Sequence, residues 1–303
     1  MATQAQLTVF SPAKINVYLR ILGKRPDGYH DLETVMLPLD FGDEIILQLQ
    51  PKVITLDCDD PRLPTDDSNL AISAARLFAK RCGEQRGAKI LLRKRTPLAA
   101  GLGGGSSNAA AVLKGLNELW GADLSERTLH ELAAGMGSDI NFFLTSGAAL
   151  CHGRGEHVEA IPCKLSAAIL LVNPGFGIST KWAYESWAKA ASTLTAKPTE
   201  VSLLLRALAE DDLARVSTLL FNSLEAPSVT KFPVLRLLKS AMHAGGATGA
   251  LMSGSGATVF GLFADAGQAK RSAEKIREQF GPSMWTHIAH VSQSCLGLAG
   301  TAR

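Results

Sequence analysis

Glycine, serine and asparagine crowd into one short stretch near the middle of the N-terminal half of the chain. Glycines fill four of the five positions 101–105, and two serines and an asparagine follow at 106–108. Because glycine has no side chain, its backbone N–H groups can close around an anion. A helix that begins there points its unpaired N–H groups at the same place. The stretch therefore predicts a binding site for a phosphate group.

The elements on either side of this loop fit that role. Residues 88–93 read as a short strand, and apolar residues at helical spacing follow the loop as far as Trp120. The dinucleotide fingerprint would need a glycine where Ser106 stands, and the Walker triplet Gly-Lys-Ser/Thr is absent from the chain. A merely flexible glycine turn is the alternative, and the strongly periodic helix that follows disfavours it.

One lysine and one aspartate could do chemistry beside a phosphate. Lys14 and Asn16 share one face of an alternating strand pattern, and Asp139 stands between Gly137 and an apolar run. A carboxylate that is partly buried in such a segment needs a partner, and Lys14 is the candidate. The alternatives are a solvated strand face for Lys14 and Asn16, and a capping role for Asp139.

Aromatic residues cluster at two other places. Tyr29 and His30 follow a Pro-Asp-Gly turn, where two rings could meet a flat ligand, although local packing is the alternative. Trp182, Tyr184 and Trp187 fall on a helix that begins at Ser179 or Thr180, and this pattern alone assigns all three to the core.

Composition limits the class of protein. The chain has 303 residues, 46% of them hydrophobic, which is enough for two domains and a substantial core. A net charge of +3 gives no support for a nucleic-acid partner. Five scattered cysteines without a C-x-x-C pair favour a reducing compartment. No signal peptide or apolar run of roughly 20 residues is visible, so we expect a soluble cytoplasmic protein without membrane contact.

The remaining pattern predicts two α+β units that meet near residues 160–166. We expect a strand over 7–22 with a break at Ser11–Pro12, and a second glycine-rich turn at 251–258. Further strands are expected at 44–50, within 147–161 (a pair), and at 167–172, 259–263 and 285–291. Helices are expected at 125–134, 200–209, 211–221, 233–243 and 265–280.

Taken together, these motifs resemble those of the GHMP kinase superfamily of small-molecule kinases. The resemblance is carried by PAKIN at 12–16, GLGGGSSNAA at 101–110 and SGSGATVF at 253–260, and it covers residues 7 to about 265. It implies a two-domain α+β GHMP kinase fold. Residues 1–163 would be the ATP-binding domain, which resembles the second domain of ribosomal protein S5. Residues 164–303 would be the GHMP C-terminal domain, and the substrates would meet between the two.

Two further segments, RPDGYHDLETVM at 25–36 and GSDINFF at 137–143, resemble one branch of that superfamily. That branch uses ATP and Mg²⁺ to phosphorylate the 2-hydroxyl of a cytidine diphosphate-linked methylerythritol, in the non-mevalonate route to isoprenoids. The alternatives are another GHMP kinase of the homoserine or mevalonate type, a diphosphomevalonate decarboxylase, or a non-catalytic nucleotide-binding regulator. The regulator would need neither Lys14 nor Asp139. We expect a monomer or weak homodimer.

The resemblance also implies roles for individual residues. Lys14 and Asp139 would be catalytic, Asn16 would position the acceptor, and Tyr29, His30 and Tyr184 would bind the cytosine. Ser106 or Ser107 would help hold Mg²⁺ or the β-phosphate, and the full set of Mg²⁺ ligands stays open. The residues that would bind ATP are Pro97, Leu98, Ala99, Ala100, Gly101, Leu102, Gly103, Gly104, Gly105, Ser106, Ser107 and Asn108.

One segment departs from the family pattern. The family usually has a proline two residues after the aspartate, in the sequence Ala-Asp-Val-Pro-Phe, and this chain has Asn141 there. We therefore expect a slightly different backbone around Asp139.

Overall fold

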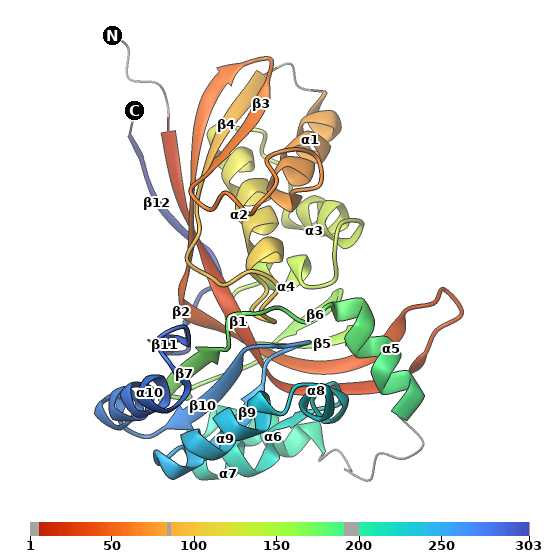
Figure 1. Ribbon diagram of the computed structural model, residues 1–303. Helices are drawn as coiled ribbons and strands as arrows, with labels where there is room; N and C mark the ends of the chain where they lie inside the picture. The colour runs from red at the N-terminus through yellow and green to blue at the C-terminus, as the bar shows by residue number, and fades with distance from the viewer. Residues whose placement is uncertain (1–5, 84–85, 191–199, 303) are drawn as a thin grey trace.

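Two β-sheets with helices packed against each make up the part of the chain that the computed structural model describes, residues 6–83, 86–190 and 200–302 (Figure 1). The strands of the first sheet are β1 (Gln6–Lys24), β2 (His30–Pro51), β3 (Ile54–Cys58), β4 (Arg86–Arg93), β5 (Ala149–Gly153), β6 (His157–Ala160), β8 (Phe221–Asn222) and β12 (Gly297–Ala302). Their main order is β12-β1-β2-β4-β3, with β5 and β6 continuing from β2, and β8 beside β1.

The second sheet is antiparallel and has the order β11-β7-β10-β9. Its strands are β7 (Ala168–Asn173), β9 (Gly249–Met252), β10 (Val259–Phe263) and β11 (Trp285–Ala289). The helices of this half are α5 (Thr180–Ala190), α6 (Val201–Ala209), α7 (Leu213–Leu219), α8 (Glu225–Lys231), α9 (Val234–Ala244) and α10 (Ala266–Phe280). Strands and helices thus mix in both halves, which confirms the predicted α+β class.

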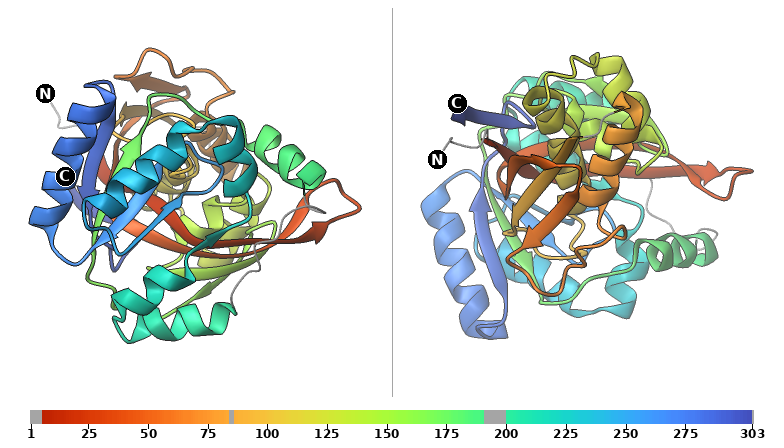
Figure 2. Two further views of the ribbon diagram at one scale, coloured as in Figure 1. Left: turned by 60° about the horizontal axis from the view of Figure 1, so that its bottom comes forward. Right: turned by 90° about the horizontal axis from the view of Figure 1, so that it is seen from above.

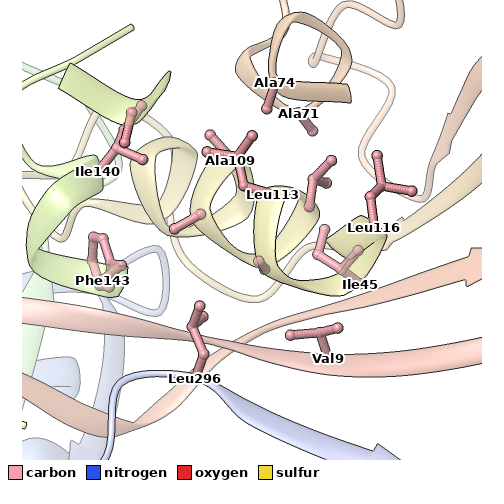
Figure 3. Packing of buried hydrophobic residues seen from close by; sticks show 14 of the residues in the cluster. Val9, Ile45, Ala71, Ala74, Ala109, Leu113, Leu116, Ile140, Phe143 and Leu296 are labelled. Carbon is pink, nitrogen blue, oxygen red and sulfur yellow. The ribbon is translucent and has the colours of Figure 1, made fainter. Parts of the chain in front are cut away.

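Helix α2 (Gly104–Leu119) is the centre of the first half. One side packs on Val9 and Ile45 of the sheet, and the other side packs on Ala71 and Ala74 of α1 (Leu70–Cys82) (Figure 3). The helices α3 (Glu126–Ala134) and α4 (Ile140–Leu144) cover the rest. Each fully buried leucine of α2 contributes roughly 2 kcal/mol. The glycine loop that opens α2 is therefore attached to a rigid support.

The long strands β1 and β2 connect the two halves. Their hairpin extends beyond the body of the molecule, and α5 lies beside its end (Figure 2). Tyr18 of β1 pairs with Phe221 of β8, and β12 returns from the end of the chain to pair with β1. Segments from beyond residue 164 thus complete the first sheet. The division into 1–163 and 164–303 stays a prediction.

Several predicted elements are confirmed and others need correction. The paired strands within 147–161 are present as β5 and β6. The predicted break at Ser11–Pro12 is wrong, since β1 continues through it with a shift of register between Pro12 and Lys14. The predicted helix 211–221 is shorter, because α7 ends at Leu219. The sequence pattern did not predict β3, β8, β9, β12, α4, α8 or the first half of β2, which are short or buried on both faces.

The register shift in β1 serves the site. Lys14 lies opposite Pro38, whose carbonyl accepts from the backbone N–H of Ser292 at 2.8 Å, and the backbone N–H of Lys14 donates to the carbonyl of Leu102 at 2.9 Å. Bulges of this kind are common where a strand must re-aim a side chain. The irregular strand therefore fastens the glycine loop to β1.

The contact of Gly101 with the second half yields a test of stability. Its φ is +77°, and a Cβ there would lie 2.0 Å from the carbonyl oxygen of Ser253. The matched control is Gly83, with φ +62° and open space around the Cβ position. We expect Gly83→Ala to lower the free energy of unfolding by about 1–2 kcal/mol through backbone strain alone, and Gly101→Ala to lower it by at least ~3 kcal/mol. Urea unfolding measures both; equal losses would show that the loop does not pack tightly against Ser253.

Candidate active site

A cavity of about 1200 Å³ opens beside the glycine loop and is lined by residues from both halves of the chain. Almost every residue that the sequence predicted for the site lines it. These residues are Lys14, Asn16, Tyr29, His30, Pro97, Leu98, Ala99, Ala100, Gly101, Leu102, Gly103, Gly104, Gly105, Ser106, Asn108, Asp139 and Tyr184. Ser107 is the exception: it is fully buried, and its hydroxyl accepts a hydrogen bond from Ser11 at 2.8 Å.

The ammonium of Lys14 lies at the centre of this arrangement and is almost completely buried. It donates to Oδ1 of Asn16 at 2.5 Å and to the carbonyl of Gly101 at 3.1 Å. Its Nζ lies 3.5 Å from Oδ2 of Asp139. The ammonium thus donates two hydrogen bonds, to Asn16 and Gly101, and forms an ion pair with the carboxylate of Asp139. The predicted pairing of Lys14 with Asp139 is confirmed.

Asn16 is held from both ends of its amide. Oδ1 accepts from Lys14, and Nδ2 donates to the hydroxyl of Thr34 at 2.8 Å, which in turn donates to the carbonyl of Tyr18 at 2.6 Å. The backbone N–H of Asn16 donates to the hydroxyl of Ser253 at 3.3 Å. The contacts of Asn16 therefore orient Lys14. The further role of Asn16 in positioning the acceptor substrate stays a prediction.

Asp139 precedes α4, and its side chain makes no capping bond to that helix. The carboxylate is 34% exposed and faces both Lys14 and the cavity. Asp139 thus occupies the N-cap position of α4, but its side chain does not cap the helix. Asn141, at the position of the family's proline, donates to the carbonyl of Glu156 at 3.1 Å and contacts His130 at 3.1 Å. These two contacts hold the backbone after Asp139 in place of the proline ring.

The glycine loop leaves the start of α2 open. Gly103 is its N-cap, with φ +71°, and no described side chain caps the helix. A Cβ on Gly103 would lie 3.0 Å from Cγ of Lys14, and one on Gly104 would lie 2.8 Å from Nζ of Lys94. Two lysines and the positive end of a helix dipole thus surround a loop without side chains. This arrangement suits a polyphosphate.

A buried polar network supports the loop from behind. The carboxylate of Asp43 is fully buried and pairs with Lys94, and it accepts from the backbone N–H and the hydroxyl of Thr96, each at 2.8 Å. Asn108 donates to Asp43 at 3.0 Å and to Ser11 at 2.9 Å. The network fixes the loop before Pro97 to the first turn of α2. Asn108 therefore has a structural role beside its place in the cavity wall.

Aromatic rings line the other end of the cavity. The rings of His30 and Tyr184 are stacked with centroids 5.1 Å apart, and Trp187 meets His30 edge-on at 5.7 Å. Burial, with a smaller contribution from Lys24, lowers the pKa of His30, so its ring stays neutral at pH 7. Nε2 of His30 is buried without a partner among the described residues. A donor or acceptor on a bound ring could satisfy it.

Tyr184 was predicted to bind the cytosine. One face of the Tyr184 ring is already covered by His30, so only the other face is open to a stacked base. Burial raises the pKa of the Tyr184 hydroxyl well above its ordinary value, and the nearby carboxylate of Asp139 adds to the rise. Tyr184 lines the same cavity as the lysine–aspartate pair. Trp182 and Trp187 pack against the core, as predicted, although Trp187 also borders this end of the cavity.

The cavity wall also shows what could hold a metal. Among the described residues no three His, Cys, Asp or Glu side chains converge on one point. Mg²⁺ usually keeps several waters and binds one or two protein oxygens together with substrate phosphates. The hydroxyl of Ser106 and the carboxylate of Asp139 both line the cavity and fit that pattern. Ser107 does not, since its hydroxyl is turned into the interior.

Three residues that support the site were absent from the prediction, Thr34, Lys94 and Ser253, and so was Arg154, which lines the cavity. Ser253 stands in the second glycine-rich turn, and its hydroxyl donates to the carbonyl of Gly101 at 2.9 Å. Lys94 belongs to the basic triplet just before the loop. Arg154 lies between two glycines, a signal that could have marked a functional turn. Thr34 lies within the 25–36 motif, but nothing in its residue type or spacing marked it out from its neighbours.

Comparison with known proteins agrees with this geometry. The model of GHMP kinases N terminal domain matches residues 69–149, and that of GHMP kinases C terminal matches residues 204–282. Proteins from Synechococcus sp. and Gloeobacter violaceus, both named 4-diphosphocytidyl-2-C-methyl-D-erythritol kinase, are 41% identical to the chain. The first alignment covers 90% of each protein, and the second covers 85% of this chain and 86% of the relative.

Solved structures extend the comparison to the fold. The crystal structure of 4-(cytidine 5'-diphospho)-2C-methyl-D-erythritol kinase matches with a TM-score of 0.77 and 34% identity, over 94% of this chain and 100% of the other. A homoserine kinase from Cytophaga hutchinsonii has the same fold, with a TM-score of 0.77 and 22% identity over 99% of each chain. No described helix is long and apolar enough to cross a membrane. The chain belongs to the GHMP kinase family, in the branch of relatives named 4-diphosphocytidyl-2-C-methyl-D-erythritol kinases.

Proposed function

We propose that this small-molecule kinase transfers the γ-phosphoryl group of ATP to the 2-hydroxyl of 4-diphosphocytidyl-2-C-methyl-D-erythritol. The observation that supports this most strongly is the position of the Lys14–Asp139 ion pair beside the glycine loop. The ammonium of Lys14 also donates a hydrogen bond to the carbonyl of Gly101 in that loop. A proton acceptor and a cation thus share one cavity with a phosphate cradle. The names of relatives at 41% identity support the choice of acceptor.

Bound Mg·ATP would supply the phosphoryl group, and the chain supplies alignment and charge compensation. The open N–H groups at the start of α2 would bind the nucleotide's phosphates, and the hydroxyl of Ser106 would be available to help hold Mg²⁺. Asp139 accepts the proton of the acceptor hydroxyl. Lys14, fixed by Asn16, compensates the negative charge on the moving group. Phosphoryl transfer needs little more than positioning and electrostatic stabilisation, so this small set suffices.

The aromatic end of the cavity supports a base-bearing acceptor over a plain sugar alcohol. Tyr29, His30 and Tyr184 present ring faces, and the unpartnered Nε2 of His30 offers one hydrogen bond to a ring. Homoserine and mevalonate contain no aromatic ring that could stack on this cluster. We further propose a cytoplasmic monomer or weak homodimer, and five cysteines that form no disulfide agree with a reducing compartment.

The choice of acceptor is tested by a panel of alcohols. The full chain is incubated with Mg·ATP and, separately, the diphosphocytidyl substrate, homoserine and mevalonate, while a coupled assay follows release of ADP. We expect turnover with the first compound and at least ~100-fold lower kcat/KM with the others, since they leave the aromatic cluster empty. Comparable turnover of homoserine or mevalonate would refute the assignment.

The role of Asp139 is tested by Asp139→Asn, which keeps the shape of the side chain and removes its charge. We expect kcat to fall roughly 1000-fold, as for the loss of a general base, while the Kd for ATP changes less than ~3-fold. Titration calorimetry gives the Kd. The matched control is Asp57→Asn. Asp57 is an exposed residue of β3 that pairs with Lys89 of β4, so this substitution should alter neither kcat nor the Kd for ATP. A parallel loss of ATP binding would contradict the role of general base and show that Asp139 mainly supports the nucleotide or its metal.

A further inference from the structure

We infer that Arg154 binds the diphosphate of the acceptor and so makes the enzyme select a nucleoside diphosphate-linked alcohol; the inference rests on the proposed function. Arg154 lies in the turn between β5 and β6 and lines the cavity. Its guanidinium carbon lies 4.9 Å from the ring centroid of Tyr29. The cation is thus next to the place where we expect the base.

The same turn reaches the reacting end of the cavity. A Cβ on Gly155 would lie 3.9 Å from Oδ1 of Asp139 and 3.4 Å from Cβ of Ser138. Arg154 therefore stands between the aromatic end and the carboxylate that faces the acceptor hydroxyl. In a cytidine diphosphate-linked alcohol the two phosphates lie between the base and the alcohol. The order of groups along the cavity matches the order of groups along the substrate.

Arg154 is held in place but keeps the capacity to bind an anion. Its Nε lies 3.5 Å from Oε1 of Glu156, and its terminal nitrogen donates to the carbonyl of Ala134 at a length of 3.5 Å. Both contacts are long, and a guanidinium has five N–H donors in a planar fork that matches phosphate oxygens. The side chain is 29% exposed, which leaves it accessible to a ligand in the cavity.

The turn itself is rigid. Oε2 of Glu156 accepts from the backbone N–H of Arg154 at 2.5 Å, and Asn141 holds the carbonyl of Glu156 at 3.1 Å. Asn141 thus links the turn to the helix that follows Asp139. A cation held on such a support loses less conformational entropy when it binds than a free side chain does.

The other cations of the cavity are less suited to this task. Lys14 is engaged by Asn16, Gly101 and Asp139, and Lys94 is buried against Asp43 on the side of the glycine loop. Lys24 and Lys181 are exposed. An exposed lysine must give up hydration and rotamer freedom to bind phosphate.

The test measures binding of cytidine, CMP and CDP to the full chain by titration calorimetry, without turnover. We expect Arg154→Met to weaken CDP binding roughly 10- to 100-fold and cytidine binding less than ~5-fold, because the charged hydrogen bonds are lost and only the contact with Tyr29 affects the base. Arg154→Lys should recover part of the loss for CDP. Lys181→Met, which removes another cation from the same cavity, should weaken CDP binding less than ~3-fold.

Equal losses for cytidine and CDP would overturn the inference and make Arg154 a support for Tyr29. An equal effect of Lys181→Met on CDP binding would overturn the inference in favour of a diffuse positive field. The inference would also be overturned if the wild-type chain bound CDP no more tightly than cytidine. Arg76→Met, an exposed partner of Asp67, serves as the background control. Failure of the proposed function is separate, since the wild-type chain would then bind CDP selectively without phosphorylating the diphosphocytidyl alcohol.

Discussion

A buried ammonium is the constraint on which the rest of this structure depends. Lys14 is removed from water, and its charge has to be matched by acceptors that the fold brings to it. Those acceptors come from β1 itself, from the glycine loop and from the residue before α4. Removal of Asn16 or of the Gly101 contact would leave a buried N–H unpaired, and removal of Asp139 would leave the buried charge without its counter-ion. The site and the packing of the N-terminal half therefore share the same contacts.

The second half of the chain completes this arrangement through backbone contacts. The carbonyl of Ser253 approaches Gly101 so closely that only glycine fits, and the hydroxyl of Ser253 bonds both the loop and Asn16. The backbone N–H of Thr258 donates to the carbonyl of Ala100 at 3.2 Å. Two glycine-rich turns from distant parts of the sequence thus support each other. The cavity for a nucleotide and an acceptor lies beside that contact.

Local patterns in the sequence predicted much of this. The glycine loop, its helix, Lys14 and Asp139 were marked by residue type and spacing. The family resemblance added Tyr184 and gave Tyr29 and His30 a role in binding the cytosine. What could not be predicted depends on three-dimensional packing. Ser106 and Ser107 are equivalent in the sequence, and only the helix phase turns Ser107 towards Ser11. The stacking of His30 on Tyr184 joins a hairpin and a helix some 150 residues apart in sequence, and Thr34 lies in a strand whose two faces are both largely buried.

The central claim is that Lys14 and Asp139 act as one unit, and a double-mutant cycle tests it most directly. Single-turnover rates are measured for the wild-type chain, Lys14→Met, Asp139→Asn and the double variant. If the pair is one unit, the double variant is about as slow as the slower single variant, because the first substitution already removes what the second would. Rate losses that multiply in the double variant would contradict the account and show that the two residues act independently.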